Sequence, residues 1–319
     1  MEGRTLTAIR HGVLVALVAT SYALAGAHVH AQAPGTPPAP AQTAPPTLAQ
    51  IRQAAQQGNA AAQYNLGVAY ETGQGVAAST AQALAWWRKA AAQGFAPAEY
   101  AVGLAYYTGD GVKQNAVLAV QWWRKAADQG IPEAQNMLGA AYISGQGVKA
   151  SPALAVQWWE KAAKLGYIRA ELNLASVYAS GGAGLLRDGA KAVSWWRQAA
   201  DHGDSEAMTN LGVAYGGGDG VTRDFDQAIA WWQKAVDLGN GDAANHLAVA
   251  YETGSGITLD LVEAYKWYSV AATRAPGEAG QLYGRFRDGV GAKLTPEQLA
   301  DGQKRADTWR AAFTEKTKP

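Results

Sequence analysis

Few residues in this sequence have the types and spacing that catalysis or metal binding requires. Cysteine is absent, so disulfides, thiolate catalysis and zinc–thiolate sites are excluded. Beyond the amino-terminal segment the histidines are His202 and His246, and no acidic cluster of metal-ligand spacing stands near either one. We expect His202, which precedes a glycine at a helix end, to complement the helix dipole. For His246 we expect a structural or solvent-facing role.

Serines and carboxylates do not form a recognisable catalytic set either. No serine stands three residues before a lysine, and Ser180 and Ser255 lie in glycine-rich loops without the strand context of a nucleophile elbow. Glu71 and Glu252 occupy the same position in the first and sixth copies of a repeat, whereas a glycosidase pair lies within about 10 Å. We therefore predict no catalytic residue, no cofactor and no metal, and we predict that the protein is not an enzyme.

A repeat of about 36 residues dominates the chain. Its clearest mark is an aromatic pair, which recurs as Trp86-Trp87, Trp122-Trp123, Trp158-Trp159, Trp195-Trp196, Trp231-Trp232 and Trp267-Tyr268. The spacings are 36, 36, 37, 36 and 36 residues, and we place the extra residue in the loop from Ser180 to Leu186. One such unit cannot bury its apolar face alone, so stacked neighbours must do so.

Each repeat is predicted to be a helical hairpin. In the first copy, helix A is expected at about residues 60–72 and helix B at about residues 80–93. Between them Gly73 and Gly75 suit a left-handed helix end and a turn, and we prefer this reading to a phosphate cradle because no strand precedes the loop. Adjacent tryptophans point about 100° apart on a helix. One is therefore expected inside the hairpin and the other against the neighbouring repeat, while Arg88 and Lys89 look like a solvated face.

The flanking segments are predicted from composition and capping signals. Residues 1–31 are expected to be a secretory signal peptide cleaved after Ala31, although an uncleaved anchor stays possible, and residues 32–46 a Pro/Ala-rich linker. Residues 47–59 are expected to form an amino-terminal capping helix, and residues 276–319 a degenerate repeat with a last helix starting near Thr295. The six repeats between them are expected at 60–94, 95–130, 131–166, 167–203, 204–239 and 240–275.

The repeat resembles the Sel-one-like repeat, a relative of the tetratricopeptide repeat. The resemblance rests on the pattern Ala62-x-Tyr64-x-Leu66-Gly67-x-x-Tyr70-x-x-Gly73-x-Gly75-Val76, followed by Ala83-x-x-Trp86-Trp87-Arg88-Lys89-Ala90-Ala91-x-x-Gly94, and covers about residues 48–290. It implies an all-α, right-handed superhelical solenoid with terminal capping helices, and a scaffold or adaptor role. The fourth and sixth copies depart from it at Ala175 and Ala248, where glycine is usual.

The charge balance bears on the partner. Removing residues 1–31 takes two of the 27 Lys+Arg and one of the 26 Asp+Glu residues, which leaves 25 of each. A neutral chain lacks the cationic excess that phosphate binding needs, so nucleic acid is not an expected partner. We expect an exported protein in the bacterial periplasm or cell envelope, or a secreted one, with no membrane span in the mature chain.

Helix A carries positions that differ between repeats while the frame stays constant. The candidate partner-binding residues are Tyr64, Glu71, Tyr100, Leu104, Tyr107 and Ile143. Aromatic side chains with polar tips are common recognition anchors, so Tyr100 and Tyr107 are expected to be exposed beside Leu104. The alternative is that these side chains pack between repeats.

The predicted function is an interaction scaffold that binds a protein or peptide on the concave face of the solenoid. A cell-envelope enzyme or binder acting on β-lactams or peptidoglycan, and a spacer without a ligand, are the alternatives.

Overall fold

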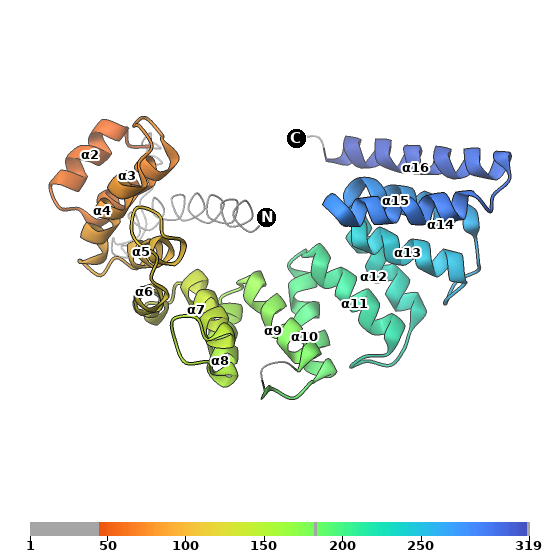
Figure 1. Cartoon of the computed structure of the whole chain (residues 1–319), viewed down its shortest axis with the longest axis horizontal. Helices are drawn as coiled ribbons and strands as arrows, with labels where there is room; N and C mark the ends of the chain where they lie inside the picture. The colour runs from red at the N-terminus through yellow and green to blue at the C-terminus, as the bar shows by residue number, and fades with distance from the viewer. Residues whose placement is uncertain (1–44, 182–183, 318–319) are drawn as a thin grey trace, which may run out of the picture. The chain divides into compact units, whose positions relative to one another are not determined.

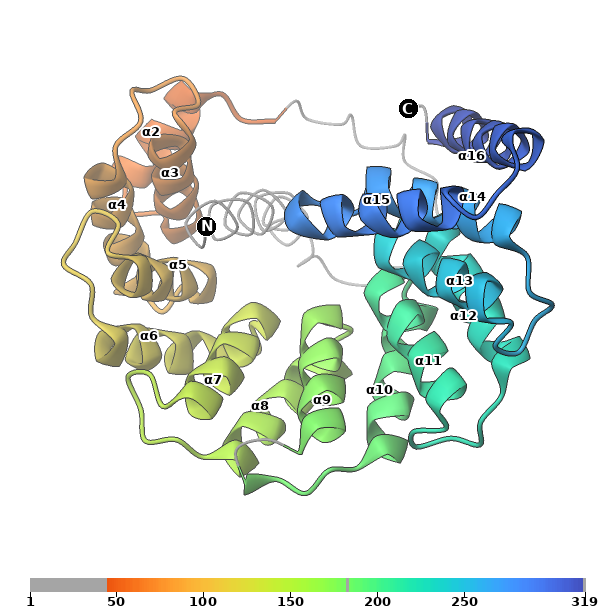
Figure 2. The ribbon, with the colours of Figure 1, turned by 45° about the vertical axis from the view of Figure 1, so that its right-hand side comes forward.

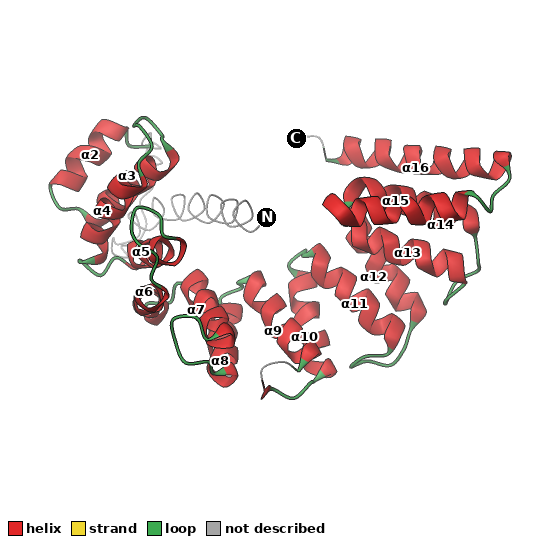
Figure 3. Ribbon diagram, in the orientation of Figure 1, coloured by secondary structure: helices red, strands yellow, loops and turns green. Residues whose placement is uncertain are grey.

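The computed structural model describes residues 45–181 and 184–317, which contain fifteen helices and no strand (Figure 3). The predicted all-α fold is therefore confirmed. The chain divides into two compact units, Met1–Leu165 and Gly166–Pro319. The predicted signal peptide and most of the predicted linker lie outside the described residues.

The first unit is a run of helical hairpins behind one capping helix (Figure 1). Its helices are α2 (Leu48–Gln56), α3 (Ala60–Thr72), α4 (Thr80–Ala91), α5 (Ala96–Thr108), α6 (Ala116–Asp128), α7 (Pro132–Ser144) and α8 (Pro152–Lys164). Helix A and helix B of the first three repeats are thus α3 with α4, α5 with α6, and α7 with α8. The capping helix α2 packs on α3, as the sequence predicts.

The second unit continues the pattern and ends in two further helices. Its helices are α9 (Ile168–Ser180), α10 (Gly189–Asp201), α11 (Ser205–Gly217), α12 (Phe225–Asp237), α13 (Gly241–Thr253), α14 (Leu261–Arg274), α15 (Gly277–Gly291) and α16 (Pro296–Lys316). Successive helices from α11 to α14 lie side by side (Figure 2). Both α15 and α16 pack against α14, so they cover the end of the last hairpin.

Capping residues set the helix boundaries. Gly73 ends α3 with φ 73°, a left-handed conformation that side chains other than glycine rarely adopt. Thr295 caps α16, and its side chain and that of Gln298 satisfy each other's backbone N–H groups in a capping box. Both boundaries agree with the sequence prediction.

Two predicted boundaries shift by a few residues. Helix α4 ends at Ala91 rather than near Gln93, and α15 is longer than the expected segment 279–287. The loop between α9 and α10 is one residue longer than the corresponding loops, since it runs from Gly181 to Asp188 while both helices keep their length of 13 residues. The extra residue therefore falls in the loop, as predicted.

The second tryptophan of each pair fills the inside of its own hairpin. Trp159 is 5% exposed, and its indole N–H donates to the carbonyl of Asn136 on α7 at 3.1 Å. A Cβ added at Gly139 would stand 2.3 Å from the indole nitrogen, so only glycine leaves room for the ring. The same contact joins Gly67 to Trp87, and Gly103 to Trp123.

The two repeats that lack this glycine carry a different ring arrangement. Ala175 is paired in sequence with Trp196, which is half-buried rather than buried. Ala248 is paired in sequence with Tyr268, a smaller ring that is 3% exposed. Glycine and a buried tryptophan therefore occur together in this chain, and alanine occurs with a smaller or less buried ring.

In the first three repeats the first tryptophan of the pair packs at the junction with the preceding hairpin or with the capping helix α2. Trp86 lies against Ala55 and Leu66, and Trp122 lies against the cluster that contains Leu84 and Val102. For these repeats the prediction that one tryptophan lies inside the hairpin and the other against its neighbour is confirmed. A lysine one turn later covers the outer face of the ring, with Lys89 3.9 Å from the Trp86 centroid.

Loops also bind adjacent repeats to one another. The second glycine of a loop lies against the first turn of the preceding helix B, where a Cβ at Gly147 would stand 2.2 Å from the carbonyl oxygen of Ala116. Its φ of 77° requires glycine for the backbone conformation as well. The glycine loop is thus a packing element of the repeat, in agreement with the prediction that it is not a phosphate cradle.

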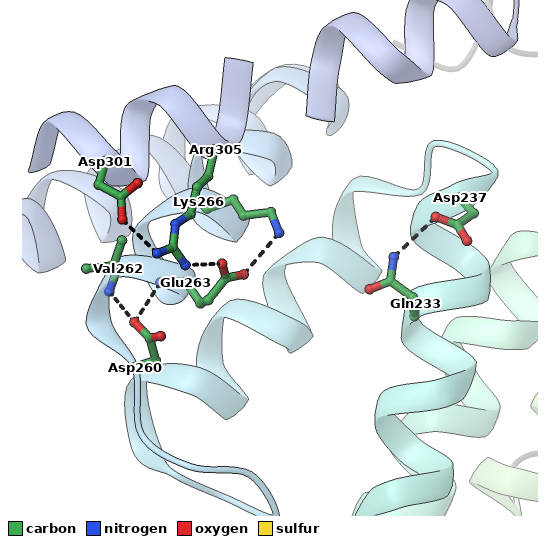
Figure 4. Close-up of polar contacts among 8 residues, drawn as sticks. All are labelled: Gln233, Asp237, Asp260, Val262, Glu263, Lys266, Asp301 and Arg305. Carbon is green, nitrogen blue, oxygen red and sulfur yellow. Dashed lines mark hydrogen bonds and ion pairs between the residues drawn. The ribbon is translucent and has the colours of Figure 1, made fainter. Parts of the chain in front are cut away.

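An ion-pair network fastens the last helix. Arg305 on α16 donates to Glu263 on α14 and to Asp301 at 2.7 Å each, and Lys266 approaches Glu263 at 3.0 Å (Figure 4). The Glu263 side chain is 16% exposed, so the network lies partly away from water. Trp309 adds an apolar contact, with its ring centroid 6.2 Å from that of Trp267. These contacts support the predicted role of α16 as the carboxyl-terminal cap.

Candidate functional site

Helix A of each repeat separates into a frame and a variable strip. In the first unit the frame includes Leu66, Val102 and Leu138, which are at most 1% exposed. The variable strip, which we call the A-strip, follows one helical face at spacings of three and four residues. It consists of Tyr64, Val68 and Glu71 on α3, Tyr100, Leu104 and Tyr107 on α5, and Glu133, Asn136, Ala140 and Ile143 on α7.

Two of the predicted binding residues are buried. Tyr64 is 0% exposed and its ring lies 5.6 Å from that of Phe95, while Tyr100 is 4% exposed in the cluster that contains Trp123 and Leu138. The prediction that Tyr100 is exposed beside Leu104 is therefore wrong. The physical reason is the closeness of neighbouring repeats, because this column packs against the next hairpin rather than facing water.

The other four predicted residues are half-buried. Leu104 and Tyr107 pack at the edge of the Tyr100 cluster, and the Tyr107 ring lies 5.3 Å from that of Trp123. Ile143 and Glu71 lie near the carboxyl ends of α7 and α3. Each of these side chains is partly packed and partly exposed to solvent, so a binding role for them stays a prediction.

Glu133 is a functional candidate that the sequence interpretation missed. It stands on α7 three residues before Asn136, so it extends the A-strip by one helical turn. Its Oε2 atom is buried and has no hydrogen-bond partner among the described residues. Burial raises the pKa of the Glu133 carboxyl, and the Glu133 charge adds to the burial that raises the pKa of the Tyr64 hydroxyl. Extending the strip back by one turn was the signal that could have found it.

Arginine residues of helix B form hydrogen bonds with tyrosine residues of the next repeat. Arg88 donates to the hydroxyl of Tyr106 on the next repeat at 2.7 Å, with its guanidinium 5.5 Å from the ring centroid. Arg197 makes the same contact with Tyr215 at 2.5 Å. Arg88 and Lys89 are exposed, as the sequence predicts for a solvated face, and the Arg88 side chain in addition links two repeats.

Both histidines have structural contacts. His202 ends α10 as its C-cap residue and lies 3.1 Å from the carboxylate of Glu171, which is 1% exposed. His246 stacks on Trp232 with ring centroids 5.2 Å apart, and burial lowers its pKa. The structural role predicted for His246 is confirmed, and His202 contacts a buried acid in addition to the helix end.

No described residues group as a metal site or a catalytic set. Within residues 45–181 and 184–317, no three Asp, Glu or His side chains gather closely enough to hold a metal ion. In the second unit Glu252 accepts a hydrogen bond from Tyr268 at 2.9 Å and pairs with Lys293 at 2.9 Å. Its carboxylate is thus engaged in packing α13 against α14 and the segment after α15.

A shallow groove of about 570 Å³ lies over α6 and the loop that follows α7, on the helix-B side of the first unit. Its charged lining includes Arg124 and Lys125. Arg124 donates to the hydroxyl of Tyr142, and Lys125 lies 4.1 Å from the centroid of Trp122. Because both cations already contact aromatic side chains of this chain, they are less available to a ligand in the groove.

No helix of the described chain is long and apolar enough to cross a bilayer.

Comparison with known proteins agrees with this architecture. The Sel1 repeat family matches residues 60–95, 96–131, 132–167, 168–204, 205–240 and 241–275. The chain is similar to the crystal structure of a protective antigen of uropathogenic Escherichia coli, with 33% identity, a TM-score of 0.71 and 83% of this chain covered. It spans 57% of the length of that antigen. It is also similar to a Sel1 repeat protein from Oxalobacter formigenes, with 33% identity, a TM-score of 0.61, and 72% and 94% of the two chains covered. No curated protein matches the chain.

Proposed function

Because the chain belongs to the Sel1 repeat family, whose members generally act as protein-interaction scaffolds, we propose that it binds a protein or peptide partner through the A-strip. This strip is the surface that we propose as the concave, partner-binding face. Hairpin repeats supply such a surface because each repeat contacts mainly its neighbours and leaves one helix face free to vary.

The observation that carries the proposal is the contrast between a constant frame and a variable strip. The frame repeats the same glycine–tryptophan contact, as in Gly67 with Trp87 and Gly139 with Trp159. The strip instead presents different side chains at equivalent positions, among them Leu104 on α5 and Ala140 on α7. A surface with only a structural role would be expected to repeat with the frame.

A cross-linking pulldown from the native cell envelope tests this function. The bait is the mature chain, compared with a variant that carries Leu104→Asn and Ile143→Asn in the A-strip. A matched control carries Val117→Asn and Leu154→Asn, two side chains on helix B that are 53% and 37% exposed. We expect saturable capture of a partner by the wild type and the control, and loss of capture by the A-strip variant, with circular dichroism showing that all three proteins are folded at the temperature of the assay. Equal capture by all three proteins would contradict the proposal.

We also propose that the protein is exported. The support is the basic start and uncharged apolar stretch within residues 1–31, followed by small residues that suit cleavage after Ala31. Amino-terminal sequencing of protein from the periplasm or medium is expected to begin at Gln32. A soluble cytoplasmic protein that retains Met1 would refute this part.

No enzymatic activity forms part of the proposal. The Sel1 repeat is a non-catalytic scaffold fold, and the described polar side chains in the second unit, such as His202, Glu171 and Glu252, are engaged in packing contacts. Incubation with a chromogenic β-lactam is expected to give no turnover. Turnover that persists at constant specific activity through stringent purification would contradict this.

A further inference from the structure

Charge is segregated between the two helix layers of the first unit. The helix-A layer, α3, α5 and α7, contains no Lys or Arg and carries Glu71, Glu99 and Glu133. The helix-B layer, α4, α6 and α8, carries Arg88, Lys89, Arg124, Lys125, Lys161 and Lys164 against only Asp128 and Glu160. The A-strip therefore lies on the negative side of this unit.

Five of the six cations of the helix-B layer, all but Lys164, contact aromatic rings on that layer or on the next repeat. Lys89 and Lys161 each lie 3.9 Å from a tryptophan centroid, and Arg88 is bound to the hydroxyl of Tyr106. Among the acids of the helix-A layer, Glu99 has its own donor, since the Gln129 amide approaches its carboxylate at 2.7 Å, and while burial raises its pKa the charge of Lys125 acts to lower it.

The Glu133 carboxylate accepts a hydrogen bond from its own backbone N–H, but no other residue of the described chain donates to its Oε2 atom. Its Oε2 atom and the Oη atom of Tyr64 are both buried without a hydrogen-bond partner among the described residues. Tyr64 is 0% exposed, and the charge of Glu133 is close enough to raise the pKa of its hydroxyl. Buried polar atoms are normally paired, because leaving one unpaired costs about 1–3 kcal/mol. The Glu133 side chain as a whole is half-buried, so it borders solvent although its Oε2 atom is buried.

On the second and third repeats, the accessible edge of the strip beside Glu133 is apolar. On α7, Glu133 and Ile143 lie on one helical face, and on the neighbouring hairpin Leu104 and Tyr107 present half-buried edges. A ligand that satisfies the acid must therefore place aliphatic or aromatic groups beside its cation. A peptide with alternating basic and apolar side chains has this chemistry.

We propose that the A-strip binds a basic, partly apolar peptide segment, with a Lys or Arg side chain donating to the Glu133 carboxylate and apolar side chains against the half-buried Leu104, Tyr107 and Ile143. This inference rests on the proposed scaffold function and names the chemistry of the partner. Electrostatic complementarity of this kind sets partner choice and association rate.

A direct binding measurement tests the inference. The probes are two fluorescent synthetic peptides, one of alternating Leu and Arg residues and its twin with every Arg replaced by Glu, and the titrant is the mature full chain. We expect saturable anisotropy changes with the Arg peptide and none with the Glu twin. Glu133→Gln is expected to weaken binding of the Arg peptide by about tenfold or more, the scale of one lost charged hydrogen bond.

Glu206→Gln is the matched control. Glu206 stands on α11 at the position equivalent to Glu133, but it is exposed and belongs to the second unit. We expect wild-type affinity from it.

The inference is overturned if the Arg peptide shows no saturable binding, if Glu133→Gln binds it as tightly as the wild type, or if the Glu twin binds equally well. This outcome is separable from failure of the proposed function. A partner that is captured through Leu104 and Ile143, but whose affinity is unchanged by Glu133→Gln, would leave the scaffold role standing and reject the basic-peptide chemistry.

Discussion

One added methyl group at the glycine facing a buried tryptophan is expected to disturb a whole repeat. On α11, a Cβ at Gly212 would stand 2.3 Å from Nε1 and 2.4 Å from Cδ1 of Trp232, distances that real Cβ atoms essentially never show. The ring would have to move and would give up its hydrogen bond to the carbonyl of Thr209 at 3.2 Å. Overpacking costs about 1–3 kcal/mol and the lost hydrogen bond about 1 kcal/mol, while the helix propensity of alanine returns about 1 kcal/mol. Gly212→Ala should therefore lower the free energy of unfolding by about 1–3 kcal/mol.

The same helix offers a control for the glycine substitution, and the sixth repeat suggests a second substitution that should compensate for it. Gly217 has no atom within 4 Å of an added Cβ, so Gly217→Ala should leave stability unchanged or raise it by up to about 1 kcal/mol. Combining Gly212→Ala with Trp232→Tyr reproduces the natural pairing of Ala248 with Tyr268. We expect the double variant to be more stable than the sum of the single changes predicts, by about 1 kcal/mol.

Chemical denaturation followed by far-ultraviolet circular dichroism measures these differences, with near-ultraviolet dichroism reporting on the tryptophan environment. Repeat proteins can unfold in parts, so coincidence of the two signals has to be checked before free energies are compared. If Gly212→Ala is as stable as Gly217→Ala and keeps the wild-type tryptophan signal, the indole does not require that glycine and the packing argument is refuted.

Three further changes test other contacts. Arg88→Ala should lower the free energy of unfolding by about 0.5–1 kcal/mol because it removes the link to Tyr106, and Tyr106→Phe should lower it by only part of this. If chemical denaturation shows no loss for either variant, the contact between Arg88 and Tyr106 does not stabilise the fold. Burial lowers the pKa of His246, so its contribution to stability is complete above its unfolded value of 6.5 and is lost as pH falls through the folded value. His246→Phe keeps a ring against Trp232, and its melting temperature should therefore fall less between neutral pH and about pH 5 than that of the wild type; equal falls would contradict the assignment. Glu263→Gln should cost about 1 kcal/mol and speed hydrogen exchange in α16, whereas unchanged exchange there would show that the ion pairs do not hold this helix.

Local signals in the sequence determine much of this fold. Gly73 ends α3 where the sequence predicts, since the left-handed conformation is a property of the residue itself. Thr295 and Gln298 mark the start of α16 in the same way, because a capping box needs only residues three apart. The two orientations of Trp86 and Trp87 follow from helix geometry alone.

The site was less predictable because it depends on how closely repeats approach. Periodicity places Tyr100 on the same face as Leu104 and Tyr107. It does not show that the neighbouring hairpin buries Tyr100 and leaves the other two side chains half-buried. The partner of Arg88 is a tyrosine 18 residues away on the next repeat, and a spacing of that kind has no local signature. Extending the strip by one turn would place Glu133 on it, but only the structure shows that its Oε2 atom is buried without a donor among the described residues.

Photo-cross-linking in living cells is the measurement that tests the central claim most directly. A photoreactive phenylalanine replaces Leu104 on the A-strip in one protein and Val117 on helix B in another, and both are irradiated in the envelope of cells that express the chain. Val117 is 53% exposed, so the second position is at least as accessible to chance collisions. The account predicts a discrete adduct from position 104, competed by excess unlabelled chain, and none from position 117. A competed adduct from position 117 together with none from position 104 would contradict the claim that the A-strip is the partner-binding surface.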